Sequence, residues 1–579
     1  MNSIAFVCSV FSFYTITFAE HFKYETILSK DKSLNLQWNV NYADELVKFR
    51  IQGKLRPNEW LAFGFSDYGE CENADLVLFW KDLFGNKMFK DVHTDNRGNI
   101  HIDQNQNYVR TPTEKLKYNR FTLEFIRKFD TCDEDDYKID NGTTHIIFFT
   151  GYGYPKHINT LQYKKGLQRV QILKPDIPDV DLPKDTTVID VTNQEITVPS
   201  TDTTYWWYLT KLPDFKRKHH IIKYEGIIEK GHEHLVHHME LFHCEARPNE
   251  VVPSYNGPGL AEGKPPGLSI CRKVIGAWAM GASSVTLPEE AGTPVGGDGW
   301  SRFVLLEVHY NNPQLTQGIK DSSGIRLYVT SKLRKYDSGI MELGLEYTNK
   351  MAIPPNQNLF SLTGYCIPDC TRTALPRTGI HIYASQLHTH MTGKRVYTKH
   401  VRNGKELPEL NRDNHYSPHF QEIRRLQEPV DVLPVGVIIL DDKGDSLITT
   451  CEDSTLDREN ITLGGFSIKE EMCVNYIHYY PAVDLEVCKS SVDSDALRAF
   501  FRFMNKRYKD NTSSTKSVAE NYQSIKWSYL ASQMLSNFYD IAPLSMQCNR
   551  SDGTRFPGNW NNKDIPRITL PITTQSGSC

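Results

Sequence analysis

The residues of this sequence best suited to chemistry are histidines, and the first informative pair is His388 and His390. If residues 386–390 form a strand, side chains two residues apart point to the same face. Two imidazoles on one face can chelate one metal ion. A single His-x-His pair is more often two surface or core histidines, so this pair needs support from elsewhere in the chain.

Further metal-ligand candidates occur at three other places in the chain. His237 and His238 are adjacent, so on a regular strand they face opposite ways and can share a metal only at a bulge or twist. His309 ends an apolar run, from which it can reach a cleft or be satisfied in the core. Met472 offers a thioether, although a buried methionine is normally core packing. Taken alone, each position has an ordinary structural interpretation.

Several other catalytic signatures are incomplete or missing from the sequence. Residues 232–236 depart from the zinc-protease pattern because the fifth residue is Val236. Cys366 and Cys370 are four residues apart, which is too far for a Cys-x-x-Cys zinc pair. No glycine-rich phosphate loop and no Gly-x-Ser-x-Gly elbow occurs. The sequence therefore favours neither a zinc site nor a phosphate-binding enzyme or serine hydrolase.

Short strands must position these candidates, and their pattern predicts an all-β fold. Alternation of apolar and polar residues with frequent turns, as in residues 47–51 and 144–149, predicts a β-sandwich. Residues 302–310 form a clear strand, and helical spacing is confined to Ala496–Tyr508 and Ser528–Tyr539. We expect a signal peptide, a sandwich, a Pro- and Asp-rich linker, two β-sandwich domains and a partly helical C-terminal extension. The corresponding ranges are 1–19, 35–150, 173–200, 201–350, 355–490 and 491–579.

Composition points to an extracellular protein rather than one that binds nucleic acid. The 579 residues carry 66 Lys and Arg against 70 Asp and Glu, a formal net charge of -4. The apolar stretch 1–19 predicts a cleaved signal peptide, and no later stretch predicts a transmembrane anchor. We expect secretion or the lumen of a secretory vesicle. Glycosylation sequons occur at Asn141, Asn460, Asn511 and Asn549.

Four stretches around the histidines and Met472 together resemble the copper type II, ascorbate-dependent monooxygenases. The resemblance is strongest to the branch with dopamine β-hydroxylase, tyramine β-hydroxylase and the DBH-like monooxygenases. Its stretches are Val236–Phe242, Leu305–Pro313, Ser385–Gly393 and Glu471–Pro481, with Asp413–Phe420 and Gly364–Cys366 in support. Phe63–Asp67 and Glu72–Leu76 resemble the DOMON domain of this branch. The resemblance implies a DOMON sandwich followed by two jelly-roll-like copper domains.

The resemblance also implies a copper-dependent monooxygenase that uses dioxygen and ascorbate. It assigns one copper to His237, His238 and His309, and another to His388, His390 and Met472. Imidazole suits both oxidation states of copper, and a thioether favours Cu(I). Tyr205 and His388 match active-site residues of the branch, although Tyr205 could equally pack between domains. His219 and His220 match family residues with a structural or supporting role.

The resemblance implies hydroxylation of a small phenylethylamine-like substrate, as in tyramine or dopamine β-hydroxylation for octopamine or catecholamine biosynthesis. Two alternatives remain open. One is a DBH-like monooxygenase that acts on an unknown, more hydrophobic small molecule. The other is a non-catalytic secreted copper-binding protein, which the six filled ligand positions disfavour.

The cysteine pattern fits the same family. The resemblance implies the disulfides Cys132–Cys579, Cys244–Cys271, Cys366–Cys488, Cys370–Cys548 and Cys451–Cys473. Cys71 would then remain free once Cys8 leaves with the signal peptide. Where the family usually has another disulfide, this chain has Trp207 and a cysteine-free loop at 251–265. Cysteines that would link subunits are also missing from 505–520, so any homodimer should be non-covalent.

Overall fold

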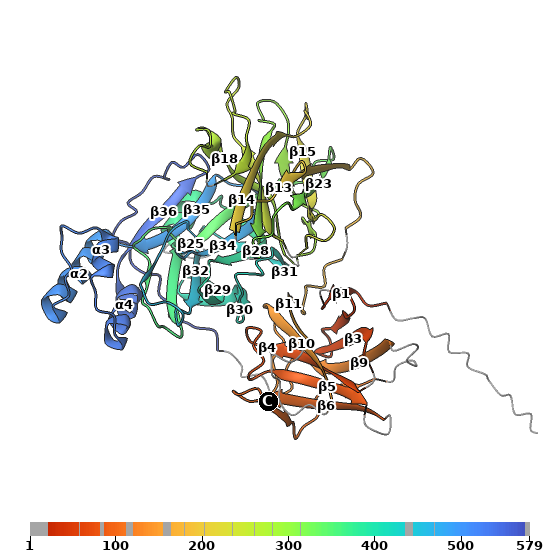
Figure 1. Ribbon diagram of the computed structural model, residues 1–579. Coiled ribbons are helices and arrows are strands. Elements are labelled where there is room, and N and C mark those ends of the chain that lie inside the picture. Colours follow the sequence, from red (N-terminus) through yellow and green to blue (C-terminus); the bar gives the residue numbers. More distant parts are fainter. Residues whose placement is uncertain are drawn as a thin grey trace, which may run out of the picture. The chain divides into compact units, whose positions relative to one another are not determined.

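The computed structural model describes residues 21–573, apart from residues 30, 57, 82–85, 112–119, 154–163, 179, 202, 234, 260, 281, 313, 435–443 and 468. The chain divides into two compact units, which are residues 1–140 with 144–168, and residues 141–143 with 169–579. Both units are built mainly from β-strands (Figure 1). The predicted all-β class with a partly helical C-terminal region is confirmed.

The first unit is a β-sandwich. One sheet has the order β1 (Tyr24–Ile27), β2 (Asn35–Asn41), β3 (Leu46–Lys54), β9 (Arg120–Lys128), β8 (Val109–Arg110). The other has the order β11 (Lys164–Val170), β10 (Thr144–Tyr152), β4 (Glu59–Ser66), β5 (Asp75–Lys81), β6 (Lys87–Thr94), β7 (Ile100–Ile102). Phe49 of β3 packs against Phe63 and Phe65 of β4, so the sheets meet in an aromatic core. Alternating buried positions in β2, β3 and β9 produce this core, as their period-2 sequence predicts.

The second unit begins with a sandwich of two larger sheets and a short strand pair. One sheet has the order β12 (Thr187–Thr192), β23 (Gly324–Thr330), β15 (His219–Ile227), β20 (Ala291–Val295), β24 (Tyr336–Asp337), with β19 (Val285–Thr286) on β15. The other has the order β17 (Asn256–Pro258), β14 (Thr203–Lys211), β21 (Phe303–Asn311), β16 (Val236–Cys244), β18 (Cys271–Ala279). Strands β13 (Ile196–Thr197) and β22 (Lys320–Asp321) form the pair. A continuous apolar core fills the space between the large sheets.

The second sandwich of this unit follows directly. Its larger sheet has the order β31 (Arg424–Val432), β28 (Ile380–Thr389), β34 (Cys473–Tyr480), β25 (Gly339–Leu345), β35 (Leu485–Val492), β36 (Leu544–Arg550). The facing sheet has the order β27 (Phe360–Cys366), β32 (Ser446–Asp453), β29 (Gly393–Arg402), β30 (Lys405–Asp413). Strands β26 (Ala352–Ile353) and β33 (Thr462–Leu463) pair beside them. Buried Tyr383 and Tyr480 also join the core of the preceding sandwich, so the two sandwiches share apolar contacts.

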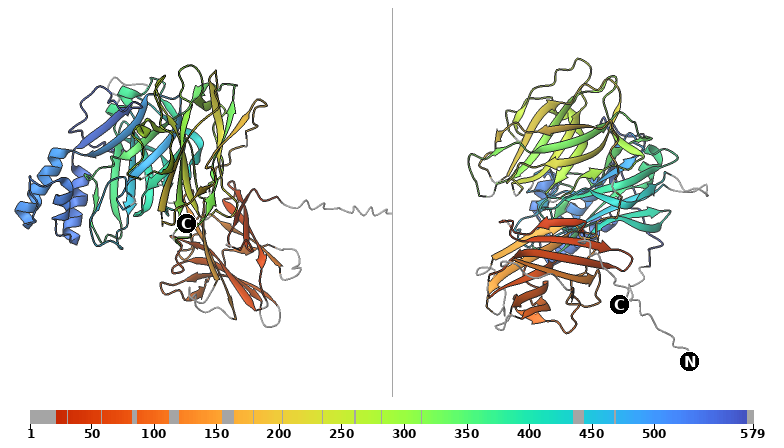
Figure 2. Two further views of the ribbon diagram at one scale, coloured as in Figure 1. Left: turned by 45° about the horizontal axis from the view of Figure 1, so that its top comes forward. Right: turned by 90° about the vertical axis from the view of Figure 1, so that its right-hand side faces the viewer.

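Helices occur mainly near the end of the chain, at one end of the second unit (Figure 2). They are α1 (Pro368–Ala374), α2 (Ser494–Tyr508), α3 (Val518–Gln523) and α4 (Tyr529–Ile541). The Asp493 side chain caps α2, and Ser528 caps α4. Leu497, Phe500 and Met504 of α2 recur at helical spacing and are buried. The helical spacing in the sequence therefore marks real helices, whereas the short α1 and α3 were not predicted.

The strands differ from the predicted domain limits at three places. β12 and β13 lie inside the predicted linker 173–200. They belong to β-sheets of the second unit, because β12 pairs with β23 and β13 pairs with β22. β25 pairs with β34 and β35, although it precedes the predicted start of the last β domain at 355. β36 joins the same sheet from the predicted extension 491–579.

Candidate metal centres

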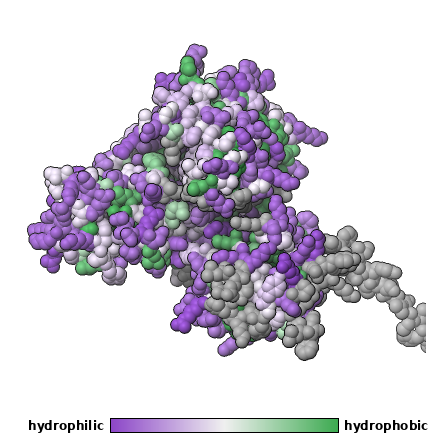
Figure 3. All heavy atoms as spheres, in the orientation of Figure 1, coloured by the Kyte–Doolittle hydropathy of each residue, from purple (hydrophilic) through white to green (hydrophobic). Residues whose placement is uncertain are grey.

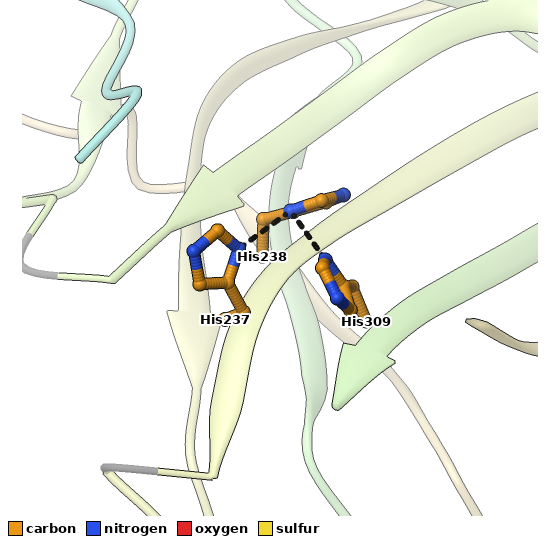
Figure 4. Close-up of side chains that lie close together, drawn as sticks. All are labelled: His237, His238 and His309. Atoms are coloured by element: carbon orange, nitrogen blue, oxygen red, sulfur yellow. Dashed lines mark hydrogen bonds between the residues drawn. The ribbon is translucent and has the colours of Figure 1, made fainter. Parts of the chain in front are cut away.

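The first centre forms where β16 and β21 lie side by side. The ladder pairs Val236 with Tyr310 and His238 with His309, so a bulge falls at His237. The bulge turns the adjacent histidines toward one another and toward His309 (Figure 4). The Nδ1 atom of His238 lies 3.1 Å from Nδ1 of His237 and 3.1 Å from Nδ1 of His309. Nitrogens that are each about 2 Å from one ion lie roughly 3 Å apart, so this spacing fits a shared metal.

Burial keeps these three imidazoles neutral. Burial, followed by the nearby His419 and Arg169, lowers the pKa of His237 to about 4. Burial also lowers the pKa of His309 to about 3 and holds that of His238 well below its usual range. A metal binds the neutral form of imidazole, so this group is ready to bind at neutral pH.

The second centre lies where β28 ends and β34 begins. Their ladder pairs His388 with Val474 and ends at the pair Thr389 and Cys473, so His390 and Met472 directly follow and precede this last pair in the chain. The rings of His388 and His390 have centroids 5.5 Å apart. Met472 is buried, and burial followed by His390 lowers the pKa of His388 to about 4. Two nitrogens and a thioether form a donor set suited to copper rather than to a hard cation.

In each imidazole of the second centre, the Nδ1 atom is hydrogen-bonded and the Nε2 atom is left to bind a metal. Nδ1 of His388 lies 2.6 Å from Oε1 of Gln421, and Nδ1 of His390 lies 3.0 Å from the backbone oxygen of Glu470. Each partner is an acceptor, so each Nδ1 carries the proton and donates it. The Nε2 lone pair of each ring is therefore available to a metal.

Glu471 holds the backbone at His390 and Met472 through hydrogen bonds. Its carboxylate is fully buried and accepts hydrogen bonds from the backbone N–H groups of His390 and Met472. It also accepts from the backbone and hydroxyl of Thr392, at 2.8 and 2.5 Å. Sequence reasoning singled out neither Glu471 nor Gln421 as a site residue, although both lie in or beside stretches that resemble the family.

The two groups of histidines are close enough to influence each other's protonation. The pKa of His238 is lowered first by burial, then by the histidines of its own group, and further by His388 and His390. The ring of His419, two residues before Gln421, meets the ring of His237 edge-on with centroids 5.7 Å apart. Segment 416–421 therefore contacts a member of each centre.

Tyr205 lies beside the first group of histidines. It lies opposite His309 in the β14–β21 ladder, and the two rings stack with centroids 4.5 Å apart. Burial, followed by Glu307 and Glu240, raises the pKa of Tyr205 to about 12, so its hydroxyl stays protonated. By contrast, the ring of His220 is held by Asp337 at 2.9 Å and accepts from the backbone of Arg334, outside both centres.

Disulfides connect elements of both sandwiches in the second unit. Four of the pairs that the resemblance implies are the pairs that the structure forms, namely Cys244–Cys271, Cys366–Cys488, Cys370–Cys548 and Cys451–Cys473. Cys132 is also disulfide-bonded, and its expected partner Cys579 lies outside the described residues, as does the stretch 1–19. Cys71 is a buried free thiol.

Trp207 occupies the place of the missing family disulfide. It pairs with Gly257 across the β14–β17 ladder, and its indole N–H donates to Glu307. The ring fills the space where a side chain at Gly259 would lie, and Lys264 sits 4.6 Å above the ring. The indole of Trp207 thus holds the loop 251–265 by packing and hydrogen bonding, where the resemblance implies a disulfide in other members of the family.

Three of the four asparagines in glycosylation sequons are exposed to solvent. Asn141, Asn460 and Asn511 are exposed, and Asn549 is half-buried in β36. Among the described residues, none of the helices has both the length and the apolar character needed to cross a bilayer.

Comparison with known proteins places these features in a family. Residues 189–317 and 336–501 match the N- and C-terminal domains of copper type II ascorbate-dependent monooxygenases, and residues 30–151 match the DOMON domain. The chain is 46% identical to dopamine beta-hydroxylase of Bos taurus, covering 96% of this chain and 90% of the relative. It is 36% identical to tyramine beta-hydroxylase of Caenorhabditis briggsae, covering 93% and 91%. It is 34% identical to human DBH-like monooxygenase protein 1, covering 82% and 75%.

Both copper-domain models match in the expected order, and the similarity extends over nearly the whole chain. The histidine groups fall within the matched domains and have donor sets suited to copper. This protein therefore belongs to the copper type II ascorbate-dependent monooxygenases and is an oxidoreductase that depends on copper and ascorbate.

Proposed function

We propose that this enzyme hydroxylates the β-carbon of a phenylethylamine such as tyramine or dopamine. In the proposed site, one copper is held by His237, His238 and His309, and the other by His388, His390 and Met472. When bound, the two ions supply the pair of electrons that splits dioxygen between product and water. The overall change is R–H + O₂ + 2 e⁻ + 2 H⁺ → R–OH + H₂O, with ascorbate as the electron source.

The protein residues hold and orient these groups. Gln421 and the Glu470 carbonyl fix the rings of His388 and His390 through their Nδ1 protons. Tyr205 stacks on His309 and limits its rotation. We assign Tyr205 and His388 to the active site on these contacts, with His388 contributing as a ligand and Tyr205 through its ring.

The observation that carries the choice of an amine is a group of carboxylates beside the centres. Glu240 lies two residues after His238, and Glu307 two residues before His309, so both share the face that bears the ligands. Burial, followed by the charges of Glu307 and then Glu342, raises the pKa of Glu240 to about 8. Carboxylates gathered in this way repel one another when they ionise, so a cation bound among them would favour their ionised form.

Glu240 is the member of this group that is best placed to bind an ammonium ion. Glu307 accepts a hydrogen bond from the indole N–H of Trp207, and Glu342 pairs with Lys489. Within the described part of the chain, no hydrogen bond or ion pair joins the carboxylate of Glu240 to another residue. The Glu240 charge also acts on Tyr476, whose ring lies 5.9 Å from that of His388. Tyr476 thus lies close enough to both Glu240 and His388 to relate the proposed ammonium position to the second centre.

The test compares amine and neutral substrates. Glu240→Gln should raise KM for tyramine at least about tenfold, because a charged hydrogen bond contributes roughly 1.5–3 kcal/mol. Turnover of a neutral analogue such as 2-phenylethanol should change less than about twofold. Glu245→Gln is the matched control, since Glu245 is exposed just beyond the same strand.

Two outcomes would redirect this proposal. If neither tyramine nor dopamine is hydroxylated while a neutral aromatic is, the chain acts on a more hydrophobic molecule. If the copper-loaded protein consumes no oxygen with ascorbate and any of these compounds, a non-catalytic copper-binding role replaces the amine hydroxylase.

We also propose that the protein acts in an oxidising compartment, outside the cell or in a secretory-vesicle lumen. The support is its disulfide content, because such bonds persist in oxidising compartments.

A non-covalent homodimer is a further proposal, with support from exposed apolar side chains on α2 and α4. Phe503, Leu530 and Ile541 are 47%, 53% and 80% exposed. Figure 3 shows hydrophobic residues on the surface at the end where these helices lie. Sedimentation of the wild type and of Ile541→Asp tests this proposal, since the charged variant should shift the protein to monomer.

A further inference from the structure

Among the described residues, only β34 forms a strand beside residues 386–389 of β28. β34 pairs with β28 as far as Thr389, but β31 pairs with it only as far as Ser385. The part of β28 that carries His388 therefore has one edge open to hydrogen bonding. A buried edge of this kind must find other partners for its backbone groups.

Side chains from segment 416–421 supply those partners. The Tyr416 hydroxyl accepts from the backbone N–H of Thr389 at 2.9 Å. The Gln421 amide nitrogen donates to the Thr389 carbonyl at 3.2 Å and to the Pro418 carbonyl at 2.8 Å. Gln386 donates in turn to the backbone oxygen of Gln421 at 2.9 Å.

These contacts fix which way the Gln421 amide points. Its nitrogen must face the carbonyls of Thr389 and Pro418, because an amide oxygen there would repel both. Its Oε1 must therefore face Nδ1 of His388, at 2.6 Å. An oxygen acceptor at this position requires the proton on Nδ1 and leaves Nε2 as the metal-binding nitrogen.

We propose that Gln421 is a positioning residue for the second copper: it fixes the tautomer and the rotation of His388 while holding the open edge of β28. This inference rests on the proposed assignment of His388, His390 and Met472 as ligands. Two functions then meet in one side chain. The oxygen acts on the imidazole, and the nitrogen acts on the backbone.

The two functions can be separated by substitution. Gln421→Met removes both the acceptor and the donor at nearly constant volume. Gln421→Glu keeps an acceptor for His388 but cannot donate to the two carbonyls. If Gln421 were needed only to hold the backbone, both variants would be equally damaging. If its acceptor matters, the glutamate variant rescues copper binding.

The experiment titrates reduced wild-type and variant protein with Cu(I) against a chromogenic chelator. X-ray absorption of the loaded protein then reports whether copper has a thioether neighbour, which identifies the Met472 centre. Gln421→Met should weaken the second copper by about 10- to 100-fold and lose the sulfur signal, with the first copper unchanged. Gln421→Glu should retain both coppers. It should also lower the reduction potential of the second, because an anionic acceptor strengthens the imidazole as a donor.

Gln427→Met is the matched control, since Gln427 is an exposed glutamine on β31 whose side chain accepts a hydrogen bond from the backbone N–H of Asp176. It should bind two coppers as the wild type does. A wild type without the sulfur signal would overturn the ligand assignment itself. A wild type with the signal and a Gln421→Met variant of unchanged affinity would overturn only the role of Gln421.

Folding is monitored by circular dichroism. If Gln421→Met does not fold, the reduction potential of Gln421→Glu decides: a lowered value supports the inference, and an unchanged value overturns it.

Discussion

At the scale of the residue, the proposed chemistry depends on a few donor atoms whose types were visible in the sequence. Met472 is the most informative of them, because a thioether in a copper site favours the reduced ion. Its burial gives it a packing role as well. Substitution must therefore separate the loss of sulfur from the loss of volume.

Met472→Leu should abolish hydroxylation while the fold persists. Leucine conserves volume, and such swaps usually lower the free energy of unfolding by less than about 1.5 kcal/mol. Met472→Ala should also be inactive, and should in addition lose about 2–5 kcal/mol of stability. Oxygen uptake and denaturant unfolding measure the two effects. Met341→Leu, at a buried methionine of β25, is the control and should remain active. Appreciable hydroxylation by Met472→Leu would contradict the ligand assignment.

The residues that support the ligands could not be predicted in the same way. Gln421 acts on a histidine 33 positions earlier, and Glu471 binds backbone groups of His390 and Thr392, about 80 positions earlier. Neither residue type is diagnostic, since glutamine and glutamate are common on surfaces. Their roles depend on which strands become neighbours, and local sequence does not specify that.

At the scale of the element, a disulfide connects the second centre to the facing sheet. Cys473 follows Met472 directly and is bonded to Cys451 of β32, which lies 22 positions earlier in the chain. The bond therefore fixes one end of the strand that begins beside the ligand. Its loss should affect the second centre before the first, since its cysteines lie on β32 and β34 and not on β16 or β21.

Replacing both cysteines by serine should cost about 3 kcal/mol in the free energy of unfolding, as loop closure over this length predicts. Cu(I) affinity should fall at the second centre and remain unchanged at the first. Denaturant unfolding and chelator competition measure the two effects. The matched control is the removal of Cys244–Cys271, which should preserve the second centre. Equal loss at both centres in either variant would refute this local role.

Strands and helices with a clear sequence period were predictable, whereas pairing across long distances was not. The bulge at His237 was anticipated only as a condition for adjacent histidines to share a metal. β12 and β13 were missed because Pro- and Asp-rich composition suggested a linker, yet backbone pairing with β23 and β22 recruits them. β25 was assigned to the preceding domain, although its partners β34 and β35 lie more than 120 residues later.

At the scale of the whole molecule, the packing of the second unit determines the protonation of its histidines. Burial is the largest influence on His237, His309 and His388, and it lowers the pKa of each to about 4, 3 and 4. A lowered pKa means that the neutral form persists at more acidic pH. The unit therefore presents neutral ligands under conditions in which free histidines would be protonated.

Copper binding at the first centre should for this reason depend little on pH in mildly acidic buffer. Three unperturbed histidines with pKa values of about 6.5 would lose roughly 1000-fold in affinity between pH 7.5 and 5.5, because protons compete for each ring. With pKa values near 3 and 4, competition begins only below about pH 5. Cu(I) affinity at pH 5.5 should then remain within about threefold of its value at pH 7.5. Chelator competition with a variant in which His388 and His390 are both replaced by alanine, which isolates the first centre, measures this directly. A steep decline above pH 5.5 would mean that burial does not keep these imidazoles neutral, and that the packing around them opens in solution.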